Sequence, residues 1–394
     1  MTTPAHQRHH RIIVLGAGFS APAGVPLSVN LFAEVRRRAE TRFGSDNIIE
    51  AELARYCEYV ERTTGNTAAA ESFDYEEFLG FLDVEFTLGF RGSKQDTEEG
   101  NGAQVVIKEL IGEIIVECTP RSPSAIPQMY KSFASSLCED DWVLTLNYDT
   151  LLEGALQAVG KPYRLFPNRF TEVYPVFGYG KLAEANNEIV VLKLHGSVDW
   201  FDRGPYEEAR EAVRAVGGEE PHACPHFRPD NPFDLVPLLE GPQMPDDPMR
   251  TLYRMQKTGA YFQQAYVPQP PFILPPSSAK AFYASTLKPL WWGIGRAGLW
   301  NLGMAIVGYS VPTHDGHVLQ ALYNLTQNYA HHGNDFAIGE VKRTPLRIVN
   351  LARTWEELRR FRLAYRFVDL DRAELWLNGM SEEAVGMLFR RSGT

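Results

Sequence analysis

Cysteine is scarce in this sequence, and no two cysteines stand close together. The 394-residue chain has four of them, Cys57, Cys118, Cys138 and Cys224. Disulfide-rich secreted folds use closely spaced cysteines in larger numbers, and cysteine-based structural zinc sites use CxxC pairs, which are missing here. The cysteine content therefore predicts a reduced, cytoplasmic protein.

The sequence also lacks an uninterrupted hydrophobic run that could span a membrane. Its most apolar region, residues 287–311, is broken by Lys288, Arg296 and Asn301. We expect this region to form protein core, and we expect no membrane partner. Residues 1–10 are polar and contain histidines, which is unlike a signal peptide and predicts a flexible tail.

Basic charge is not in excess. The chain has 39 basic and 49 acidic residues, giving a formal net charge of −10. This balance argues against a general nucleic-acid platform, so we expect no direct nucleic-acid binding. A hydrophobic content of 44% and a charged content of 22% are typical of a globular protein of one large domain with insertions or two ordinary domains.

What the sequence does have is a short apolar segment that leads directly into glycines. Residues 12–15 have no polar alternation, which is typical of a strand buried on both faces, and Gly16, Ala17 and Gly18 follow at once. A strand, a glycine-rich loop and a helix, here at residues 31–37, often form a dinucleotide site. Because Ala21 stands where the usual fingerprint has a third glycine, a turn that uses glycine for steric reasons alone stays open as an alternative.

Four further apolar segments are each followed by glycine or by a polar residue. They are residues 142–146 before Asn147 and Asp149, 188–194 before His195, 301–307 before Gly308 and Ser310, and 347–349 before Asn350. Since the carboxyl ends of parallel strands line the ligand crevice of an open sheet, we expect these side chains at a functional site. Asp149 fits a helix cap equally well, and His195 taken alone is as consistent with a structural role as with a catalytic one.

These alternating elements predict an α/β fold, a Rossmann-like doubly wound parallel sheet with a helical insertion and a second, irregular insertion. We expect the helical insertion at residues 36–135 and a proline-rich insertion or lid with little regular structure at residues 201–270. The sheet domain then comprises residues 11–35, 136–200 and 271–394, including a strand at 272–274, a helix within 281–298 and a helix at 372–391. His222, Cys224 and His226 lie within five residues without a second ligand pair, so a structural zinc ion is not favoured and no metal is expected.

The segments GAGFSAPAGVP, TLNYD, LKLHGS, IVGYSVP and RIVN occur together in this order. In order and character they resemble the sirtuin NAD-binding domain, and in particular the divergent bacterial sirtuin-like proteins. The resemblance covers about half of the chain, in residues 11–35, 140–200 and 272–352, and leaves both insertions outside it.

The resemblance implies NAD as the substrate and a role for each matching position. Gly16, Ala17, Gly18 and Ser20 would cradle the pyrophosphate, Asn147 and Asp149 would face the nicotinamide ribose, His195 would be the catalytic histidine, and Gly308, Ser310 and Asn350 would line the adenosine half.

The chain also departs from the sirtuin pattern. Sirtuin deacylases carry two CxxC pairs that build a zinc module beside the acyl-peptide groove, and this sequence has none. Leu27 and Ser28 stand where a Phe-Arg pair is expected. Sirtuin-like proteins without the zinc module include bacterial antiphage effectors that hydrolyse NAD, some of them with an Argonaute-type protein or a HerA-type hexameric ATPase as partner.

The resemblance, together with the missing zinc module, favours an NAD glycohydrolase that acts as a regulated antiphage effector. We expect this enzyme to act as a homo-oligomer or with a partner protein. Asn147 would orient the ribose or the attacking water, His195 would act as general base, and Asp149 would orient the ribose or stabilise its cationic character. The alternatives are an NAD-dependent deacylase, an ADP-ribosyltransferase, and a non-catalytic module that senses NAD or ADP-ribose.

Overall fold

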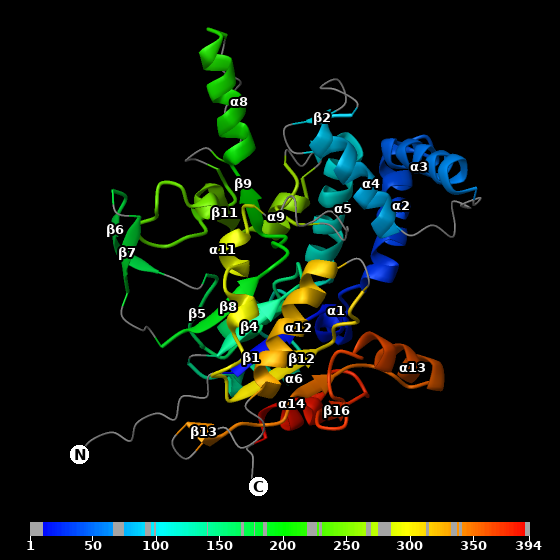
Figure 1. Cartoon of the computed structure of the whole chain (residues 1–394). Coiled ribbons are helices and arrows are strands. Elements are labelled where there is room, and N and C mark those ends of the chain that lie inside the picture. The colour runs from blue at the N-terminus through cyan, green and yellow to red at the C-terminus, as the bar shows by residue number, and fades with distance from the viewer. Residues whose placement is uncertain are drawn as a thin grey trace.

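The computed structural model is an α/β protein built on a seven-stranded parallel sheet (Figure 1). The structure describes residues 11–65, 75–90, 96–97, 100–139, 141–166, 169–176, 178–183, 187–218, 227, 231–264, 269–274, 285–312, 315–331, 337–338 and 341–390. The predicted tail at residues 1–10 and the cluster at residues 222–226 lie outside these described residues.

The sheet has the strand order β16-β15-β12-β1-β4-β8-β5. The strands are β1 (Arg11–Leu15), β4 (Trp142–Thr145), β5 (Tyr163–Arg164), β8 (Ile189–Lys193), β12 (Gly303–Val307), β15 (Arg347–Val349) and β16 (Glu374–Trp376). The longer helices are α2 (Ser28–Phe43), α3 (Ile48–Thr64), α4 (Tyr75–Leu88), α5 (Gly102–Cys118), α6 (Gln128–Ser136), α7 (Leu151–Ala158), α8 (Gly204–Ala215), α12 (Gly316–His331), α13 (Trp355–Ala364) and α14 (Glu382–Phe389).

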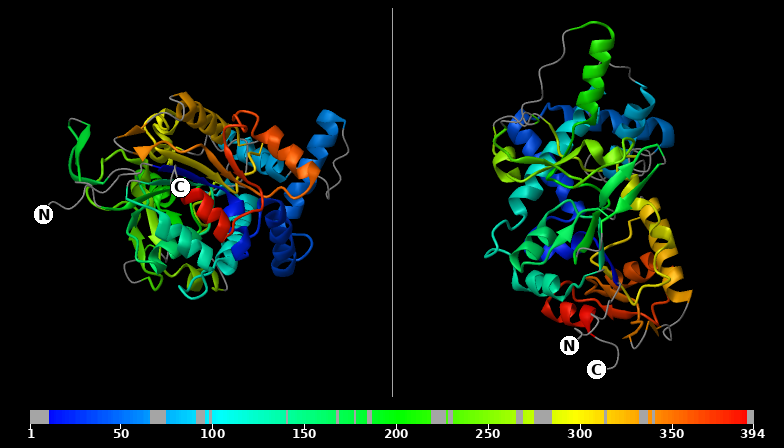
Figure 2. Two further views of the ribbon diagram at one scale, coloured as in Figure 1. Left: turned by 90° about the horizontal axis from the view of Figure 1, so that it is seen from below. Right: turned by 90° about the vertical axis from the view of Figure 1, so that its left-hand side faces the viewer.

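The sheet is doubly wound, as predicted. From β1 the chain proceeds through β4 towards β8, whereas β12, β15 and β16 extend the sheet in the opposite direction. Helices α12 and α13 lie on one side of the sheet, and α6 and α14 lie on the other (Figure 2). Because helices cover both faces, the central strands are buried on both sides. This burial explains why β12 and the first four residues of β8 are apolar without interruption.

The register brings the strand ends to one line. Val349, Val307, Leu15, Thr145 and Lys193 are neighbours across five adjacent strands, and each is the last residue of its strand. The residues that follow these positions therefore gather at one edge of the sheet. The direction of winding reverses between β1 and β12, which is where open α/β sheets usually bind their ligands.

A second hydrophobic core lies beside this edge. It joins α2, α3, α4 and α5 to residues of a three-stranded antiparallel sheet made of β9 (Trp200–Asp202), β10 (Leu235–Pro237) and β11 (Leu252–Met255), and to α9 (Thr258–Phe262). The two insertions predicted as separate units thus share one core. Helix α8 projects from this part of the molecule, and none of its residues is buried (Figures 1 and 2).

Several expectations differ from the structure. Residues 201–270 contain helices and an antiparallel sheet, so the prediction of little regular structure is wrong. Residues 272–274 do not join the main sheet, because Ile273 instead forms an isolated antiparallel bridge with Gly196. The expected helix at 281–298 is reduced, within the described residues, to α11 (Lys288–Trp291) and a short 3₁₀ turn (Ile294–Arg296).

The sequence analysis also missed the two edge strands of the main sheet. β5 has two residues, and β16 occupies part of the segment that was expected to form one long helix at 372–391. Helix α6, expected within the helical insertion, packs in the core of the sheet domain instead.

Candidate functional site

A cavity of about 750 Å³ opens at the carboxyl ends of β15, β12, β1, β4 and β8. Leu31 of α2, Glu76 of α4 and Ile115 of α5 also line it, so the cavity lies between the sheet and the helical insertion. Nine of the ten residues predicted from the sequence line this cavity: Gly16, Ala17, Gly18, Asn147, Asp149, His195, Gly308, Ser310 and Asn350.

Ser20, the tenth, is not among the lining residues, and it is fully buried. Its hydroxyl accepts a hydrogen bond from Nδ2 of Asn147 at 3.1 Å, and the same Nδ2 donates to the carbonyl of Gly16 at 3.0 Å. Both protons of the Asn147 amide are thereby used within the protein. Any contact between the Asn147 side chain and a substrate is therefore made through Oδ1.

The glycines are required by close approach of two backbone turns. A Cβ atom at Gly18 would lie 2.8 Å from Cα of Gly308, and one at Gly308, which has φ +65°, would lie 2.2 Å from N of Phe19. The N–H groups of Gly16 and Gly18 donate to the carbonyls of Val307 and Gly308 at 2.9 and 2.8 Å. These glycines thus let the chain pass close to a ligand, while their own amides are engaged in holding β1 to β12.

His195 is fixed by the segment that follows the second insertion. Its carbonyl accepts from N–H of Leu274 at 2.9 Å, and the next residue, Gly196, has φ +80°. A Cβ atom at Gly196 would lie 2.2 Å from the carbonyl oxygen of Phe272, so only glycine fits after this histidine. His195 as a whole residue is 3% exposed, and it lines the cavity.

In the structure, Asp149 agrees with both interpretations that the sequence left open, a cavity residue and a helix cap. It lines the cavity, and its Oδ1 accepts from N–H of Leu151 at 3.0 Å at the start of α7, as a helix cap would. Its backbone carbonyl accepts from Nζ of Lys193, a fully buried lysine that also pairs with Glu153 at 2.9 Å. The segment that carries Asn147 and Asp149 is therefore tied to the end of β8, two residues before His195.

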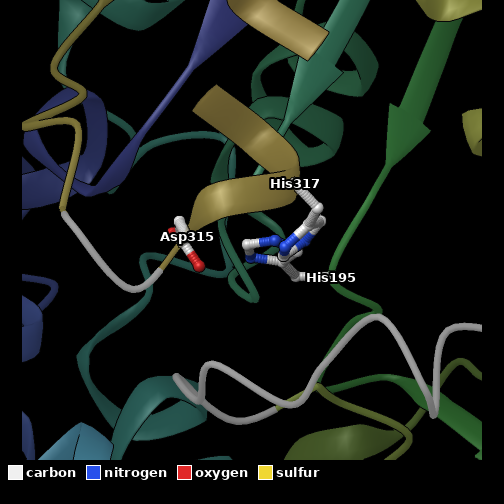
Figure 3. A group of neighbouring side chains, drawn as sticks. All are labelled: His195, Asp315 and His317. Carbon is white, nitrogen blue, oxygen red and sulfur yellow. The ribbon is translucent and has the colours of Figure 1, made fainter. Parts of the chain in front are cut away.

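Two functional candidates were missed in the sequence. Asp315 and His317 lie at the start of α12 and approach His195, so that one possible ligand atom from each of the three residues lies within 4.8 Å of the others (Figure 3). The Trp291 ring lies beside both imidazoles, with centroids 6.3 Å from His195 and 5.1 Å from His317. The signal in the sequence was the Asp-Gly-His triplet shortly after the GYSVP segment.

Two tyrosines near this group act as neutral hydrogen-bond donors, Tyr309, which is buried, and Tyr148, which is half-buried. The hydroxyl of Tyr309 donates to Oδ2 of Asp315 at 3.1 Å, and burial together with Asp315 raises the pKa of Tyr309 far above its usual range. Burial also raises the pKa of Tyr148, whose hydroxyl donates to the carbonyl of Leu274. Both phenols stay protonated at physiological pH and therefore act as donors.

Asn350 belongs to the far end of the cavity. Its Nδ2 donates to the carbonyl of Tyr309 at 3.0 Å, and its Oδ1 accepts from N–H of Leu351 at 2.8 Å. The same carbonyl of Tyr309 accepts from the Tyr365 hydroxyl at 2.7 Å. These bonds fix the loop after β12, and Arg360 of α13 adds a cationic side chain to the lining at this end.

A family model described as SIR2-like domain matches residues 141–210 of the chain. This segment holds β4, α7 and β8, and with them Asn147, Asp149 and His195. The match suggests an NAD-related activity. A search of curated proteins found no match.

Solved structures of Sir2 enzymes resemble the chain distantly. One described as the structural basis for the mechanism and regulation of Sir2 enzymes is 14% identical, with 97% of this chain and 91% of that chain covered and a TM-score of 0.35. A Sir2 structure with p53 peptide and NAD⁺ is 14% identical, with 96% and 90% covered and a TM-score of 0.31. At these scores the likenesses say nothing about individual residues of the cavity.

Within the described part of the chain, no helix combines the length and apolar character needed to cross a membrane.

Proposed function

We propose that this protein is an NAD glycohydrolase, which converts NAD⁺ and water to ADP-ribose, nicotinamide and a proton. The observation that carries the proposal is the cavity at the carboxyl ends of five strands, which collects Asn147 and His195 beside the glycine turn of β1. The SIR2-like match over residues 141–210 supports NAD as the ligand of this cavity. A volume of about 750 Å³ is within the range of cofactor and small-molecule sites.

The reaction asks for few chemical groups. The bond between C1′ of the ribose and the pyridinium nitrogen breaks, and its electron pair leaves with neutral nicotinamide. The ribose then carries oxocarbenium character at C1′, water attacks this carbon, and the water loses a proton. An enzyme accelerates this sequence by fixing the ribose, stabilising the developing positive charge and accepting the proton.

Asn147 and His195 supply these functions in the proposal. With Nδ2 held by Gly16 and Ser20, Oδ1 of Asn147 has a fixed position from which it accepts a hydrogen bond from a ribose hydroxyl or from the attacking water. His195 is the general base of the proposal, because a neutral imidazole nitrogen can accept the proton that the water loses. Asp149, a neighbour of Asn147 in the cavity wall, adds negative charge that favours the cationic ribose.

The test is NAD consumption by the purified chain, with nicotinamide and ADP-ribose both quantified. We expect His195→Ala and Asn147→Ala to lower turnover by about 100-fold or more, because each removes a group that acts in the transition state. His331→Ala, at the exposed end of α12, is the matched histidine control and should keep full activity. Wild-type activity in both cavity variants, with unchanged melting temperatures, would remove these residues from the reaction.

The products separate hydrolysis from the alternative activities. Free ADP-ribose in a one-to-one ratio with nicotinamide indicates hydrolysis, whereas a modified acceptor indicates ADP-ribosyl or acyl transfer. NAD binding without turnover, in the presence and absence of cell extract, would indicate a sensing module.

We further propose that the hydrolase is a regulated effector of bacterial antiphage defence, because unrestrained NAD hydrolysis kills the cell that makes it. The resemblance to sirtuin-like effectors supports self-association or a partner such as a HerA-type ATPase or an Argonaute-type protein. The projecting helix α8 offers a surface with no buried side chains for such contacts. A constitutively active monomer, shown by light scattering during turnover, would contradict this regulation.

A further inference from the structure

Two imidazoles and one carboxylate meet at the edge of the cavity. His195 comes from the loop after β8, whereas Asp315 and His317 come from the start of α12, and their ligand atoms all lie within 4.8 Å of one another (Figure 3). His195 and Asp315 are 3% and 5% exposed, and both line the cavity. The group is therefore an assembled feature of the interior and joins two distant parts of the chain.

The donor set matches one class of metal ion. Zinc-class ions bind imidazole nitrogen and carboxylate oxygen, and non-structural sites commonly use three protein ligands with a fourth position left for water. Mg²⁺ and Ca²⁺ prefer sites built from oxygen ligands, so two imidazoles disfavour them. Ligand atoms around tetrahedral zinc lie about 3.3 Å apart, which small side-chain rotations can reach from the present spacing.

The surroundings orient the ligands. The Tyr309 hydroxyl donates to Oδ2 of Asp315 at 3.1 Å, which directs the carboxylate in the way that outer hydrogen bonds direct metal ligands. The Trp291 ring lies near both imidazoles, with centroids 6.3 Å from His195 and 5.1 Å from His317. Its own Nε1 is held by the carbonyl of Leu194 at 3.1 Å, so the ring has a fixed place.

We propose that His195, Asp315 and His317 bind one divalent transition-metal ion of the zinc class, and that this ion inhibits NAD hydrolysis. The inhibitory part rests on the proposed function. A nitrogen lone pair of His195 that coordinates a metal cannot accept a proton from water. The ion also places positive charge beside the cavity, which opposes the cationic ribose of the transition state.

Metal binding is tested on the full chain without reference to activity. After treatment with a chelator and its removal, zinc chloride is titrated by calorimetry, and Co²⁺ is added separately to detect the visible absorption of tetrahedral coordination. We expect Asp315→Asn and His317→Ala to weaken zinc binding by at least about ten-fold and to abolish the Co²⁺ spectrum. His331→Ala, on the same helix, should bind as the wild type does.

A second control addresses the other histidines. The triple variant His222→Ala, Cys224→Ser, His226→Ala removes the competing group seen in the sequence. Binding that is lost in this variant, or that persists unchanged in both Asp315→Asn and His317→Ala, would overturn the proposed site.

The inhibition is measured separately. Zinc should lower NAD hydrolysis by the wild type by at least about ten-fold, and a chelator should restore it. Zinc should change the rate of His317→Ala by less than about two-fold relative to the zinc-free rate of the same variant. Zinc binding at the site without any effect on measured turnover would overturn the inhibitory role. If no NAD turnover is detected, the NAD affinity of the protein is measured with and without bound zinc, and an unchanged affinity also overturns the inhibitory role. The zinc titration tests the metal site independently of this result.

Discussion

The side-chain amide of Asn147 donates a hydrogen bond to the hydroxyl of Ser20, 3.1 Å away, where both side chains are buried. Ser20 was predicted to contact a pyrophosphate, whereas here its hydroxyl holds the residue proposed to face the ribose. The predicted pyrophosphate contact stays untested. The observed bond gives Ser20 a positioning role that can be measured.

The first prediction concerns this bond. Ser20→Ala leaves one proton of the buried Asn147 amide unsatisfied, which should lower the free energy of unfolding by about 1 to 2 kcal/mol. It also frees the amide to rotate, so kcat for NAD hydrolysis should fall by about ten-fold with a smaller change in KM. Ser132→Ala, a serine on α6 away from the cavity, is the control. An unchanged kcat in Ser20→Ala would show that Asn147 needs no second anchor.

The second prediction concerns the buried pair of Lys193 and Glu153. Their side chains are 0% and 2% exposed, with Nζ and Oε1 2.9 Å apart. Lys193→Met leaves a buried carboxylate without its cation, so we expect a loss of about 3 to 5 kcal/mol in unfolding free energy, measured in urea. The double variant Lys193→Met, Glu153→Leu should recover much of this loss, since it removes the uncompensated charge. A double variant as unstable as the single one would show that Lys193 acts mainly through the carbonyl of Asp149.

The sequence predicts the strands of the sheet that are largely buried, because their residues form short apolar runs. The runs that form β1, β4, β8, β12 and β15 are short, apolar and followed by glycine or polar residues, so their place and the position of the site could be derived together. β16 could not, because this edge strand is only half-buried and carries Glu374. The prediction that residues 272–274 join the main sheet was wrong although Ile273 is buried. An apolar run indicates burial but does not indicate which element the segment pairs with.

From the sequence, only those residues of the candidate site that directly follow a strand could be predicted. His195 and Asn147 follow strands. Asp315 immediately precedes α12 and His317 lies in its first turn, so both reach His195 only through the packing of α12 on the sheet. Long-range approaches of this kind leave no spacing pattern in one sequence. The shared core of the two insertions could not be predicted either, because it also depends on contacts between residues far apart in the sequence.

The third prediction concerns Gly308. Its φ of +65° and a Cβ position 2.2 Å from the backbone of Phe19 leave no room for a side chain. Gly308→Ala must push apart the turns after β1 and β12, so we expect a loss of about 3 kcal/mol or more in stability and loss of NAD binding. Gly316→Ala, where nothing lies within 4 Å of the added atom, is the control and should remain folded and active. Normal NAD binding by Gly308→Ala would contradict this close approach.

The fourth prediction concerns pH and the pair of Asp199 and Arg254, joined at 2.8 Å beside the loop that carries His195. Burial opposes ionisation of Asp199, yet Arg254 and Lys193 outweigh it and hold the pKa of Asp199 below its usual value. A lowered carboxyl pKa stabilises the fold above the unfolded-state pKa of about 3.9, and this contribution is lost as the pH falls through the folded-state pKa.

Removing the Arg254 cation should change how the stability of the protein depends on pH. In Arg254→Met the buried carboxylate loses its main partner, so we expect a loss of about 3 kcal/mol in unfolding free energy at pH 7. The deficit should shrink towards pH 4, because a protonated Asp199 needs no cation. Arg250→Met, an exposed arginine nearby, should change stability by less than about 0.5 kcal/mol at either pH. A deficit that is equal at pH 7 and pH 4 would mean that Arg254 stabilises the protein through its packing, with no contribution from the charge of Asp199.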